Sequence, residues 1–133
     1  MTRSTRPRRQ HPSTPTSQNI RLGRLGEAMA VRYLRGKGML ILDRNWRCRW
    51  GEIDIVGMLG SELVICEVKT RMGHGHGSPL EAITPTKRKR LHRLGELWLA
   101  QREGNNDRVR IDAIGISISP ATGEYNIHHA QGI

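Results

Sequence analysis

The sequence predicts a single α/β domain, and three patterns carry that prediction. Apolar residues recur at helical spacing over residues 19–37 and again over 85–98, and each run follows a capping signal. Between these runs, residues 51–69 alternate apolar and polar side chains and are rich in β-branched residues, which is typical of strands. A further alternating segment, residues 109–117, follows the second run. Helices and strands that alternate along a chain favour a layered α/β fold.

The chain begins with a basic tail that we expect to be disordered. Residues 1–18 consist mainly of Arg, Ser, Thr, Pro and Gln and contain no apolar cluster. Nothing in such a segment can be buried to offset the entropy lost on ordering. The predicted domain therefore spans residues 19–133. The tail either adds non-specific attraction to phosphates or is a solvated segment without a role.

The first predicted helix begins at Ser17 or Asn19, either of which can cap it. One stripe of the helix contains Gly23 and Gly26, and each glycine inside a helix costs about 1 kcal/mol relative to alanine. Two glycines one turn apart predict that the helix backbone approaches a neighbouring element closely. Glu27 would then point toward the same neighbour. The alternative is a surface glutamate beside two unfavourable glycines.

Residues 39–42 predict an apolar strand, and after Asp43-Arg44-Asn45 the residues 46–50 predict a strand that leads directly into the turn at Gly51. Arg47 and Arg49 have the opposite parity to Trp46, so they face the other side of the strand. Trp46 fits core packing, and the two arginines are placed to follow phosphates. The sequence leaves Trp50 open between core packing and stacking on a base.

The central segment, residues 51–69, predicts a β-hairpin with a defined register. Gly60 and Ser61 form a two-residue loop signal, in which the glycine supplies the positive φ that the first loop position of a type II′ turn needs. With this loop, Leu59 pairs with Glu62, and each further step outward fixes another pair.

Counting outward places Asp54 opposite Glu67 and Glu52 opposite Lys69. Directly opposed residues of an antiparallel pair have Cβ atoms about 4.5–5.5 Å apart, and alternation places these four polar side chains on one face. The other face carries four apolar side chains, those of Ile53, Ile55, Cys66 and Val68.

Two carboxylates held this close predict a cation site. One of the two pKa values rises unless a cation neutralises the pair. A hard divalent ion does so, and Mg²⁺ typically takes one or two carboxylates and keeps several waters. The alternative is a charged solvent face, with Glu52 and Lys69 as an ordinary cross-strand ion pair. The spacing alone leaves both interpretations open.

The second predicted helix begins after Thr84, which caps it, with Pro85 in its first position. Lys87 continues the inner apolar stripe backward by one turn, so it faces inward at the positive end of the helix, where anions are favoured. Arg90 and its basic neighbours make the rest of this end positive. A solvated basic face is the alternative, and it suits the neighbours better than Lys87.

The remaining segments carry weaker signals. Residues 72–79 are rich in glycine and histidine and predict a mobile loop at the rim of a substrate groove. The His-x-His pair could suggest a zinc site, but no other histidine or cysteine stands at ligand spacing nearby. Strands are predicted over 109–117 and, at the sheet edge, over 124–130. His128 and His129 have no partner that the sequence identifies.

The charge balance favours an acidic polymer as partner. The formal net charge is +10, and without the five arginines of residues 1–21 there are still 17 basic residues against 12 acidic ones. Nucleic acid is therefore expected ahead of a membrane, and no apolar run approaches the length of a membrane span.

The two cysteines, Cys48 and Cys66, suit small buried hydrophobes in a reducing compartment, and a cytoplasmic location is expected. An organelle transit peptide is the minor alternative for the Arg- and Ser/Thr-rich start.

Several strings give the sequence a family resemblance. Asp54, Glu67 and Lys69 match the Asp, turn, Glu-x-Lys pattern of the restriction-endonuclease-like, or PD-(D/E)xK, nucleases. More specific are the strings Gly26-Glu27 with Ala30 and Tyr33-Leu34, Asn45-Trp46-Arg47-Cys48-Arg49 with Gly51-Glu52-Ile53-Asp54, Glu67-Val68-Lys69-Thr70-Arg71, Thr84-Pro85-x-Lys87, and Arg110-x-Asp112. Over about residues 20–116 the chain resembles the YraN family of small, mostly uncharacterised bacterial proteins. Ile111 stands where that family usually has an aromatic residue.

The resemblance implies a restriction-endonuclease-like αβββαβ core, in which helices flank a mixed central sheet. It also implies an active-site set of Glu27, Asp54, Glu67 and Lys69. In that set Asp54 and Glu67 would bind Mg²⁺ or Mn²⁺, with Glu27 as a further ligand, direct or through water. Lys69 would orient the attacking water or stabilise developing charge.

Two functions follow as expectations. The first is a metal-dependent nuclease that acts on nucleic acid, DNA ahead of RNA, and selects structure rather than sequence. The second is a nucleic-acid-binding module of the same fold without catalysis, against which the full acidic set argues. Both leave a homodimer open and involve no membrane. In both, the phosphate backbone would be held by five basic residues, Arg47, Arg49, Arg71, Lys87 and Arg90.

Overall fold

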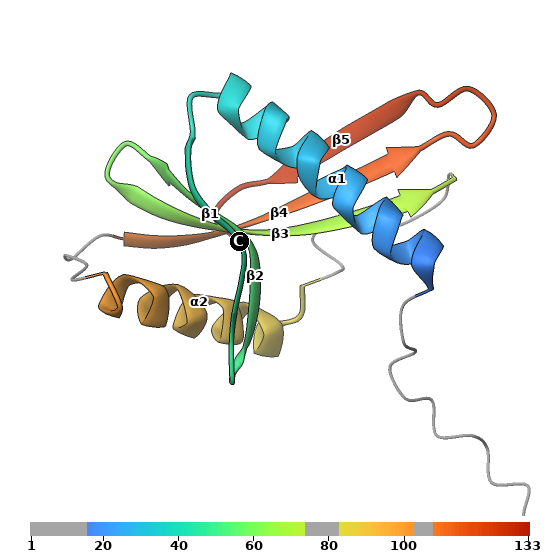
Figure 1. Ribbon diagram of the computed structural model, residues 1–133. Helices are drawn as coiled ribbons and strands as arrows, with labels where there is room; N and C mark the ends of the chain where they lie inside the picture. Colours follow the sequence, from blue (N-terminus) through green and yellow to red (C-terminus); the bar gives the residue numbers. More distant parts are fainter. Residues whose placement is uncertain (1–15, 74–82, 103–107) are drawn as a thin grey trace, which may run out of the picture.

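The computed structural model describes residues 16–73, 83–102 and 108–133. Most of the predicted tail and most of the Gly-His loop lie outside these ranges. The helices and strands follow one another in the order αβββαββ (Figure 1). Their bounds are α1 Ser17–Gly36, β1 Leu40–Cys48, β2 Gly51–Leu59, β3 Glu62–Met72, α2 Pro85–Ala100, β4 Arg108–Ile118 and β5 Tyr125–Ala130.

The strands form one mixed sheet in the order β1-β2-β3-β4-β5. β3 and β4 run parallel, from the pair Glu62–Arg108 to the pair Met72–Ile118, and the other neighbouring strands are antiparallel. Helix α2 lies between β3 and β4 in the chain and makes the crossover that a parallel pair requires. The mixed central sheet and the αβββαβ order are confirmed, and β5 is the edge strand that the sequence predicts.

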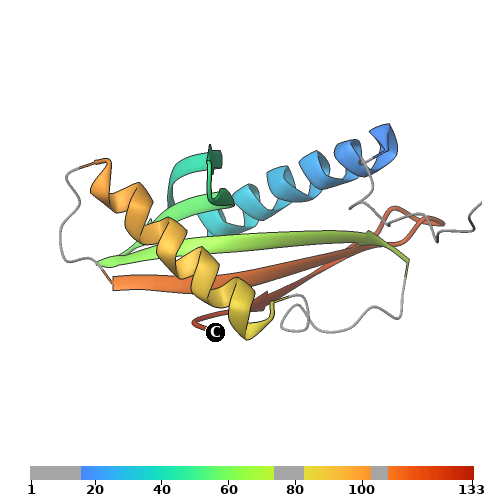
Figure 2. The ribbon, with the colours of Figure 1, turned by 90° about the horizontal axis from the view of Figure 1, so that it is seen from below.

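The two helices cover opposite faces of the sheet, so the protein has two hydrophobic cores. In Figure 1, α1 crosses above the sheet and α2 lies below it, and Figure 2 shows the same separation from below. The core under α1 includes Leu34, Ile55, Cys66 and Ile116. The core under α2 includes Ile53, Ile65, Leu94, Trp98 and Ile111.

The helix caps agree with the sequence for α2 and differ for α1. Thr84 Oγ1 accepts a hydrogen bond from Lys87 N at 3.1 Å, and Pro85 takes the first helical position, as predicted. Thr16 caps α1 by accepting from Asn19 N at 3.1 Å, so the prediction of Ser17 or Asn19 as the cap is wrong. Within the described residues, neither helix is long and apolar enough to cross a membrane.

The central hairpin has the predicted register over its first half. Gly60 has a φ of +61°, and the pairs run from Leu59–Glu62 outward to Ile55–Cys66. The antiparallel pairing between β2 and β3 ends there, so the predicted pairing of Asp54 with Glu67 is wrong. Beyond this point β2 stays paired only with β1, while β3 continues beside β4 to Met72.

The β1–β2 hairpin changes direction where Asn45 faces Asp54. The pairs Arg44–Ile55 and Trp46–Ile53 flank this level, and Asn45 has a left-handed φ of +51°. Residues of equal parity normally share a face, yet Ile55 packs in the core under α1 and Ile53 in the core under α2. The prediction that both isoleucines share one face is therefore wrong, because the alternation breaks between them.

A fully buried carboxylate, Asp112, ties the last strand to the sheet. Arg110 donates to both of its oxygens at 2.9 Å, His129 Nε2 donates at 2.7 Å and Gly132 N at 3.0 Å. Burial alone would raise the pKa of Asp112, but the hydrogen bonds from His129, Arg110 and Gly132 lower it below its ordinary value. His129 thus has a partner on β4, and Tyr33 Oη lies 3.1 Å from its other ring nitrogen.

Candidate active site

The strands β2 and β3 separate at a fork, and Asp54 lies in that fork. Asp54 Oδ2 accepts a hydrogen bond from Val68 N at 2.8 Å. The side chain of Asp54 therefore satisfies a backbone donor of β3 at a position where the strand pairing with β2 has ended. This bond fixes the orientation of the carboxylate at the open edge of β3.

A hollow of about 860 Å³ opens beside the fork. Its walls come from the first half of α1, from the β1–β2 hairpin and from the last part of β3. The hollow brings together most of the side chains that the sequence selected. Its lining includes Glu27, Arg47, Glu52, Asp54, Lys69 and Arg71.

Asp54 is the most perturbed carboxyl group of the hollow. Burial raises the pKa of Asp54 to about 7, and the nearby Glu67 carboxylate contributes to the rise. The hydrogen bond from Val68 N acts in the opposite direction, because it stabilises the charged form. A carboxyl group with a pKa near neutrality, held in a partly enclosed hollow, is typical of functional sites.

Glu67 lies close enough to Asp54 to affect it, but it does not line the hollow. Its Oε1 atom forms an ion pair with Lys87 Nζ at 2.9 Å, and its side chain is 19% exposed. Lys87 does face inward from the first turn of α2, as the sequence predicts. Its amine is therefore engaged by a carboxylate rather than directed at solvent.

The predicted pairing of Glu52 with Lys69 is wrong. Glu52 pairs across the hairpin with Arg47 instead, and the two side chains form an ion pair at 3.0 Å between Arg47 Nε and Glu52 Oε2. This outcome also excludes the alternative in which Glu52 and Lys69 form a cross-strand ion pair. The side chain of Lys69 is exposed and lines the same hollow as Asp54.

Glu27 reaches the hollow from α1, and its carboxylate is oriented by Asn45 of β1. With its amide nitrogen turned toward the carboxylate, Asn45 donates to both Glu27 oxygens at 2.9 Å. Burial raises the pKa of Glu27, and the charge of Glu52 adds to the rise. Sequence reasoning missed Asn45. The available signal was an asparagine inside a strand, since asparagine tolerates the left-handed backbone found here.

The close approach predicted for α1 occurs at one of the two glycines. A Cβ atom on Gly26 would overlap the Thr70 hydroxyl of β3, so the helix backbone lies directly against the strand. Gly23 has no heavy atom within 4 Å of such a position. The prediction is therefore confirmed for Gly26 and wrong for Gly23. Because Glu27 directly follows Gly26, this contact seats the carboxylate beside β3.

The donor chemistry of the fork fits a hard divalent cation. Asp54 and Glu67 are neighbouring carboxylates whose negative charges repel each other. Mg²⁺ typically binds through one or two carboxylates and several waters. Among the described residues, no three His, Cys, Asp or Glu side chains are grouped to hold a metal ion. The three predicted ligands, Glu27, Asp54 and Glu67, are therefore not gathered into one such group. Asp54 and Glu67 remain as neighbouring carboxylates, and Glu27 lines the hollow with Asp54.

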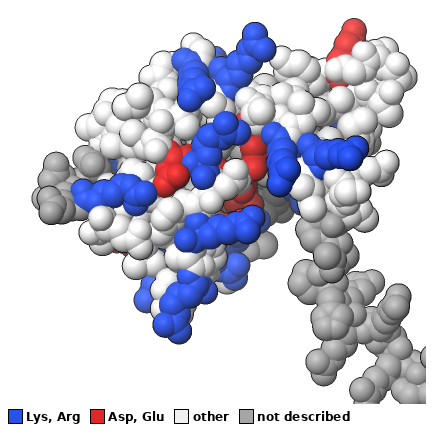
Figure 3. All heavy atoms as spheres, viewed as in Figure 1, with Lys and Arg blue, Asp and Glu red and all other residues white. Residues whose placement is uncertain are grey.

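Basic side chains surround the acidic ones on this face. Figure 3 shows a central group of acidic side chains with lysine and arginine side chains around it. Of the predicted phosphate-binding residues, Arg71 lines the hollow and Arg47 is 76% exposed despite its ion pair. Arg49 lies over the ring of Trp50, and Arg90 is exposed on α2 beside Gly51.

The sequence has many relatives. A sequence profile described as "Uncharacterised protein family UPF0102" matches residues 26–116, which is more than half of the chain. The chain belongs to the UPF0102 family. A UPF0102 protein of Kineococcus radiotolerans is 49% identical over 113 residues, covering 84% of this chain and 92% of that protein. One of Streptomyces coelicolor is 48% identical over 114 residues, with 84% and 87% covered. One of Mycobacterium tuberculosis is 44% identical over 122 residues, with 89% and 95% covered.

The UPF0102 match spans the whole fork. It contains Glu27, Asp54, Glu67, Lys69 and Lys87, and it ends within β4. Strand β5, which carries His129, follows the matched segment. The relatives named above carry the family name alone, so the chemistry of the site has to be argued from its geometry.

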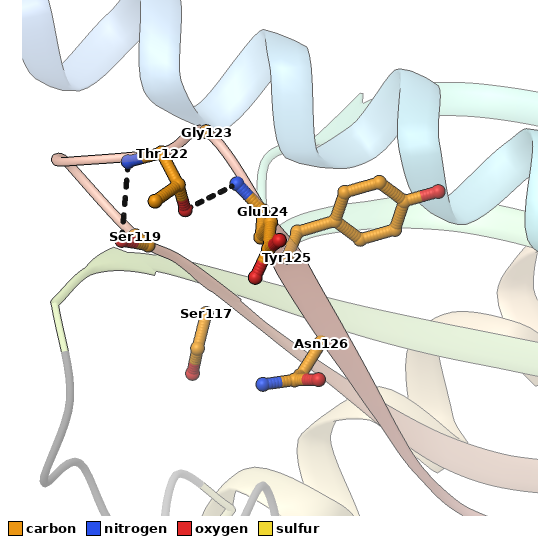
Figure 4. Close-up of a pocket in the computed structure, with 7 residues that line it drawn as sticks. All are labelled: Ser117, Ser119, Thr122, Gly123, Glu124, Tyr125 and Asn126. Carbon is orange, nitrogen blue, oxygen red and sulfur yellow. Dashed lines mark hydrogen bonds between the residues drawn. The ribbon is translucent and has the colours of Figure 1, made fainter.

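A second hollow of this UPF0102 protein, of about 700 Å³, lies at the β4–β5 turn (Figure 4). Two hydrogen bonds join residues of its lining: Thr122 N donates to Ser119 Oγ at 3.4 Å, and Glu124 N donates to Thr122 Oγ1 at 3.2 Å. Among the described residues, Glu124 is the carboxylate that lines it, and no lysine or arginine of these residues does so, in contrast to the hollow at the fork.

Proposed function

We propose that this protein is a metal-dependent nuclease that hydrolyses phosphodiester bonds and selects the structure of its nucleic acid rather than the base sequence. The strand fork supports the proposal, because Asp54 lies close enough to Glu67 for their charges to interact and shares a hollow with Lys69. Bound Mg²⁺ or Mn²⁺ would polarise the scissile phosphate and lower the pKa of a water for attack. The same ions suit the two carboxylates as ligands.

The residues of the fork have distinct roles in this mechanism. Asp54 presents its carboxylate in a fixed orientation, because Val68 N holds one of its oxygens. Glu67 would be the second ligand, and Glu27 would be a further ligand, direct or through water. Lys69 supplies an exposed positive charge in the hollow, where it would orient the attacking water or stabilise charge that develops on the phosphate.

Lys87 has a second role in addition to the phosphate contact that the sequence suggested. Its amine neutralises Glu67 at 2.9 Å, so it compensates the second carboxylate when no cation does. Binding of a divalent ion by Glu67 would release or share this amine. Lys87 would then be free to contact the substrate phosphate.

The surrounding cations favour binding without sequence preference. Arg47 and Arg71 line the hollow, and Arg90 is exposed on α2 beside Gly51. Phosphate contacts from arginine position a nucleic acid and supply salt-dependent affinity, but they carry no base information. Selectivity would therefore come from the shape of the substrate.

The test is cleavage of duplex, single-stranded, flapped and branched DNA in Mg²⁺ or Mn²⁺. We expect the wild-type protein to cut at least one of these. Asp54→Ala and Glu67→Ala should each reduce the rate by about 100-fold or more, the scale of a single electrostatic contribution. Glu96→Ala is the matched control, because Glu96 is an exposed carboxylate of α2 that bonds to His92. Equal cutting by the wild type and both fork variants would show that the site is wrongly assigned.

One observation favours a second candidate, a nucleic-acid-binding module without catalysis. Glu67 is already neutralised by Lys87, and an ion pair of this kind needs no metal. Titration calorimetry with and without Mg²⁺ separates the two functions. Tight binding of nucleic acid that is indifferent to the ion, together with the absence of cleavage, would support the module.

A further inference from the structure

The tip of the β1–β2 hairpin exposes a tryptophan that nothing in the fold accounts for. Trp50 is 59% exposed, whereas tryptophan side chains are usually well buried because of their large apolar surface. Trp46 and Cys48 of the same hairpin pack against the core under α2, and Trp50 does not join them. Core packing, one of the two interpretations that the sequence left open, is therefore excluded for Trp50.

Turn chemistry does not account for Trp50 either. Cys48 pairs with Gly51, so Arg49 and Trp50 form a two-residue loop. Such loops are dominated by Asn, Asp and Gly, which supply positive φ angles. Here the positive φ falls on Gly51, at +147°, so the loop itself places no demand for an arginine and a tryptophan. The loop backbone is held by Trp50 N, which donates to Cys48 Sγ at 3.4 Å.

The surroundings of Trp50 are suited to a nucleotide. The Arg49 guanidinium lies 4.5 Å from the ring centroid of Trp50, which leaves an aromatic surface beside a positive charge. Arg90 of α2 lies next to Gly51, directly after Trp50 in the chain. Aromatic rings combined with nearby cations are the arrangement by which proteins bind unpaired bases, since every base has a π-face and every nucleotide a phosphate.

We propose that Trp50 and Arg49 form a stacking subsite for an unpaired base, so that the substrate contains a single-stranded segment next to the cut. This inference rests on the proposed nuclease function. Bases inside a duplex are already stacked on one another, and only an unpaired base offers its face to Trp50. The class of substrate is therefore a single strand or a flapped or branched duplex.

The spacing between the subsite and the fork limits where the cut occurs. Trp50 and Asp54 are four residues apart on one hairpin. At about 3.3 Å per strand residue their Cα atoms are at most about 13 Å apart, which corresponds to roughly four base steps of 3.4 Å. Cleavage is therefore expected within about four nucleotides of the stacked base.

The experiment measures binding in EDTA, so that no cleavage contributes. The probes are labelled oligodeoxythymidine, a blunt duplex and a duplex with a single-stranded flap. Trp50→Ala should weaken binding of the first and third probes by about tenfold, and Trp50→Phe should restore most of the affinity, because base stacking tolerates another aromatic ring. Binding of the blunt duplex should change by less than about twofold. Tyr125→Ala is the matched control, since Tyr125 is an equally exposed aromatic residue on β5, at 56%.

Three results would overturn the subsite. They are unchanged binding of oligodeoxythymidine by Trp50→Ala, an equal loss for the blunt duplex and the flapped duplex, and failure of the wild type to bind any probe with a single-stranded segment. A peptide that competes at Trp50 while the oligonucleotides do not would indicate a protein partner and would also overturn it. Failure of the proposed nuclease is distinguishable, because it appears as equal cutting by wild type, Asp54→Ala and Glu67→Ala in Mg²⁺.

Discussion

The carboxylate of Asp54 on β2 accepts a hydrogen bond from the backbone N–H of Val68 on β3, at 2.8 Å, where the two strands have already separated. The Asp54 side chain thus links β2 to β3 beyond the end of their backbone pairing. The contact holds Asp54 next to Glu67, and burial together with that neighbouring charge raises the pKa of Asp54 to about 7.

Asp54→Asn should stabilise the metal-free protein at pH 8. The substitution removes the charge and keeps an acceptor for Val68 N. Because the pKa of Asp54 rises from 3.8 to about 7 on folding, the folded wild type holds a proton that the unfolded chain has lost between these values. The wild type therefore loses stability as the pH rises from about 4 to about 7, by at most about 4 kcal/mol.

Urea denaturation of both proteins between pH 4 and pH 8 measures this difference. The gap in the free energy of unfolding should be small near pH 4 and widest at pH 8. Mn²⁺ should narrow it at pH 8, because an ion bound by the native state alone stabilises that state. Parallel pH profiles of the two proteins would contradict the raised pKa.

Lys87→Met should tighten the binding of Mn²⁺. Lys87 neutralises Glu67 at 2.9 Å, and removal of the amine leaves two neighbouring carboxylates that a divalent ion can compensate. The same change should lower the free energy of unfolding in EDTA by about 1–3 kcal/mol, because a half-buried carboxylate loses its partner. Calorimetric titration with Mn²⁺ gives the affinity, and Lys89→Met, an exposed lysine of the same helix, is the control. Weaker Mn²⁺ binding by Lys87→Met would place the ion elsewhere.

Alanine substitutions at Gly23 and Gly26 of α1 should change the free energy of unfolding in opposite directions. Gly26→Ala should lower the free energy of unfolding by about 1–3 kcal/mol, because the added methyl group overlaps the Thr70 hydroxyl. Gly23→Ala should raise it by up to about 1 kcal/mol, because the position is open and alanine favours the helix. Thermal or urea denaturation distinguishes the two. Stabilisation by both substitutions would mean that α1 does not lie against β3.

Asp112→Asn should be among the most destabilising single changes in the chain. It leaves Arg110 and His129 without the fully buried carboxylate that both contact, a loss of about 3–5 kcal/mol in comparable buried pairs. Glu62→Gln is the control, because Glu62 contacts the same Arg110 at 3.4 Å but is 38% exposed, and exposed pairs contribute about 1 kcal/mol or less.

The pH dependence of wild-type stability offers a second check on Asp112. Hydrogen bonds lower the pKa of this carboxyl in the folded state, so its contribution is present above about pH 4 and is lost as the pH falls further. Acid denaturation followed by circular dichroism should begin in that range for the wild type. An unchanged acid transition in Asp112→Asn would contradict the assignment.

Features fixed by a few neighbouring residues could be predicted from the sequence. The Gly60 turn and the alternation around it determine the register from Leu59–Glu62 to Ile55–Cys66, and Thr84 with Pro85 determines the start of α2. These signals act over two to four residues, so no knowledge of tertiary packing is needed.

Features that depend on distant packing could not be predicted. The change of direction at Asn45 and Asp54 depends on tertiary packing, because Ile55 packs in the core under α1 and Ile53 in the core under α2. The pairing of Lys87 with Glu67 depends on how α2 crosses the sheet. Likewise, Tyr33 Oη lies within hydrogen-bond distance of His129, which is 96 residues later in the sequence, and no local pattern connects the two.

The two cores also fix how rigid the fork is. Ile53 and Ile55 are both fully buried, one beneath each helix, so the backbone of the residue between them is clamped from both sides. A side chain held there is preorganised, because its backbone has little freedom to move. Shortening either isoleucine would loosen the backbone that holds Asp54 without removing a charged group, so the packing of the two cores and the position of this carboxylate are coupled through one short segment of the chain.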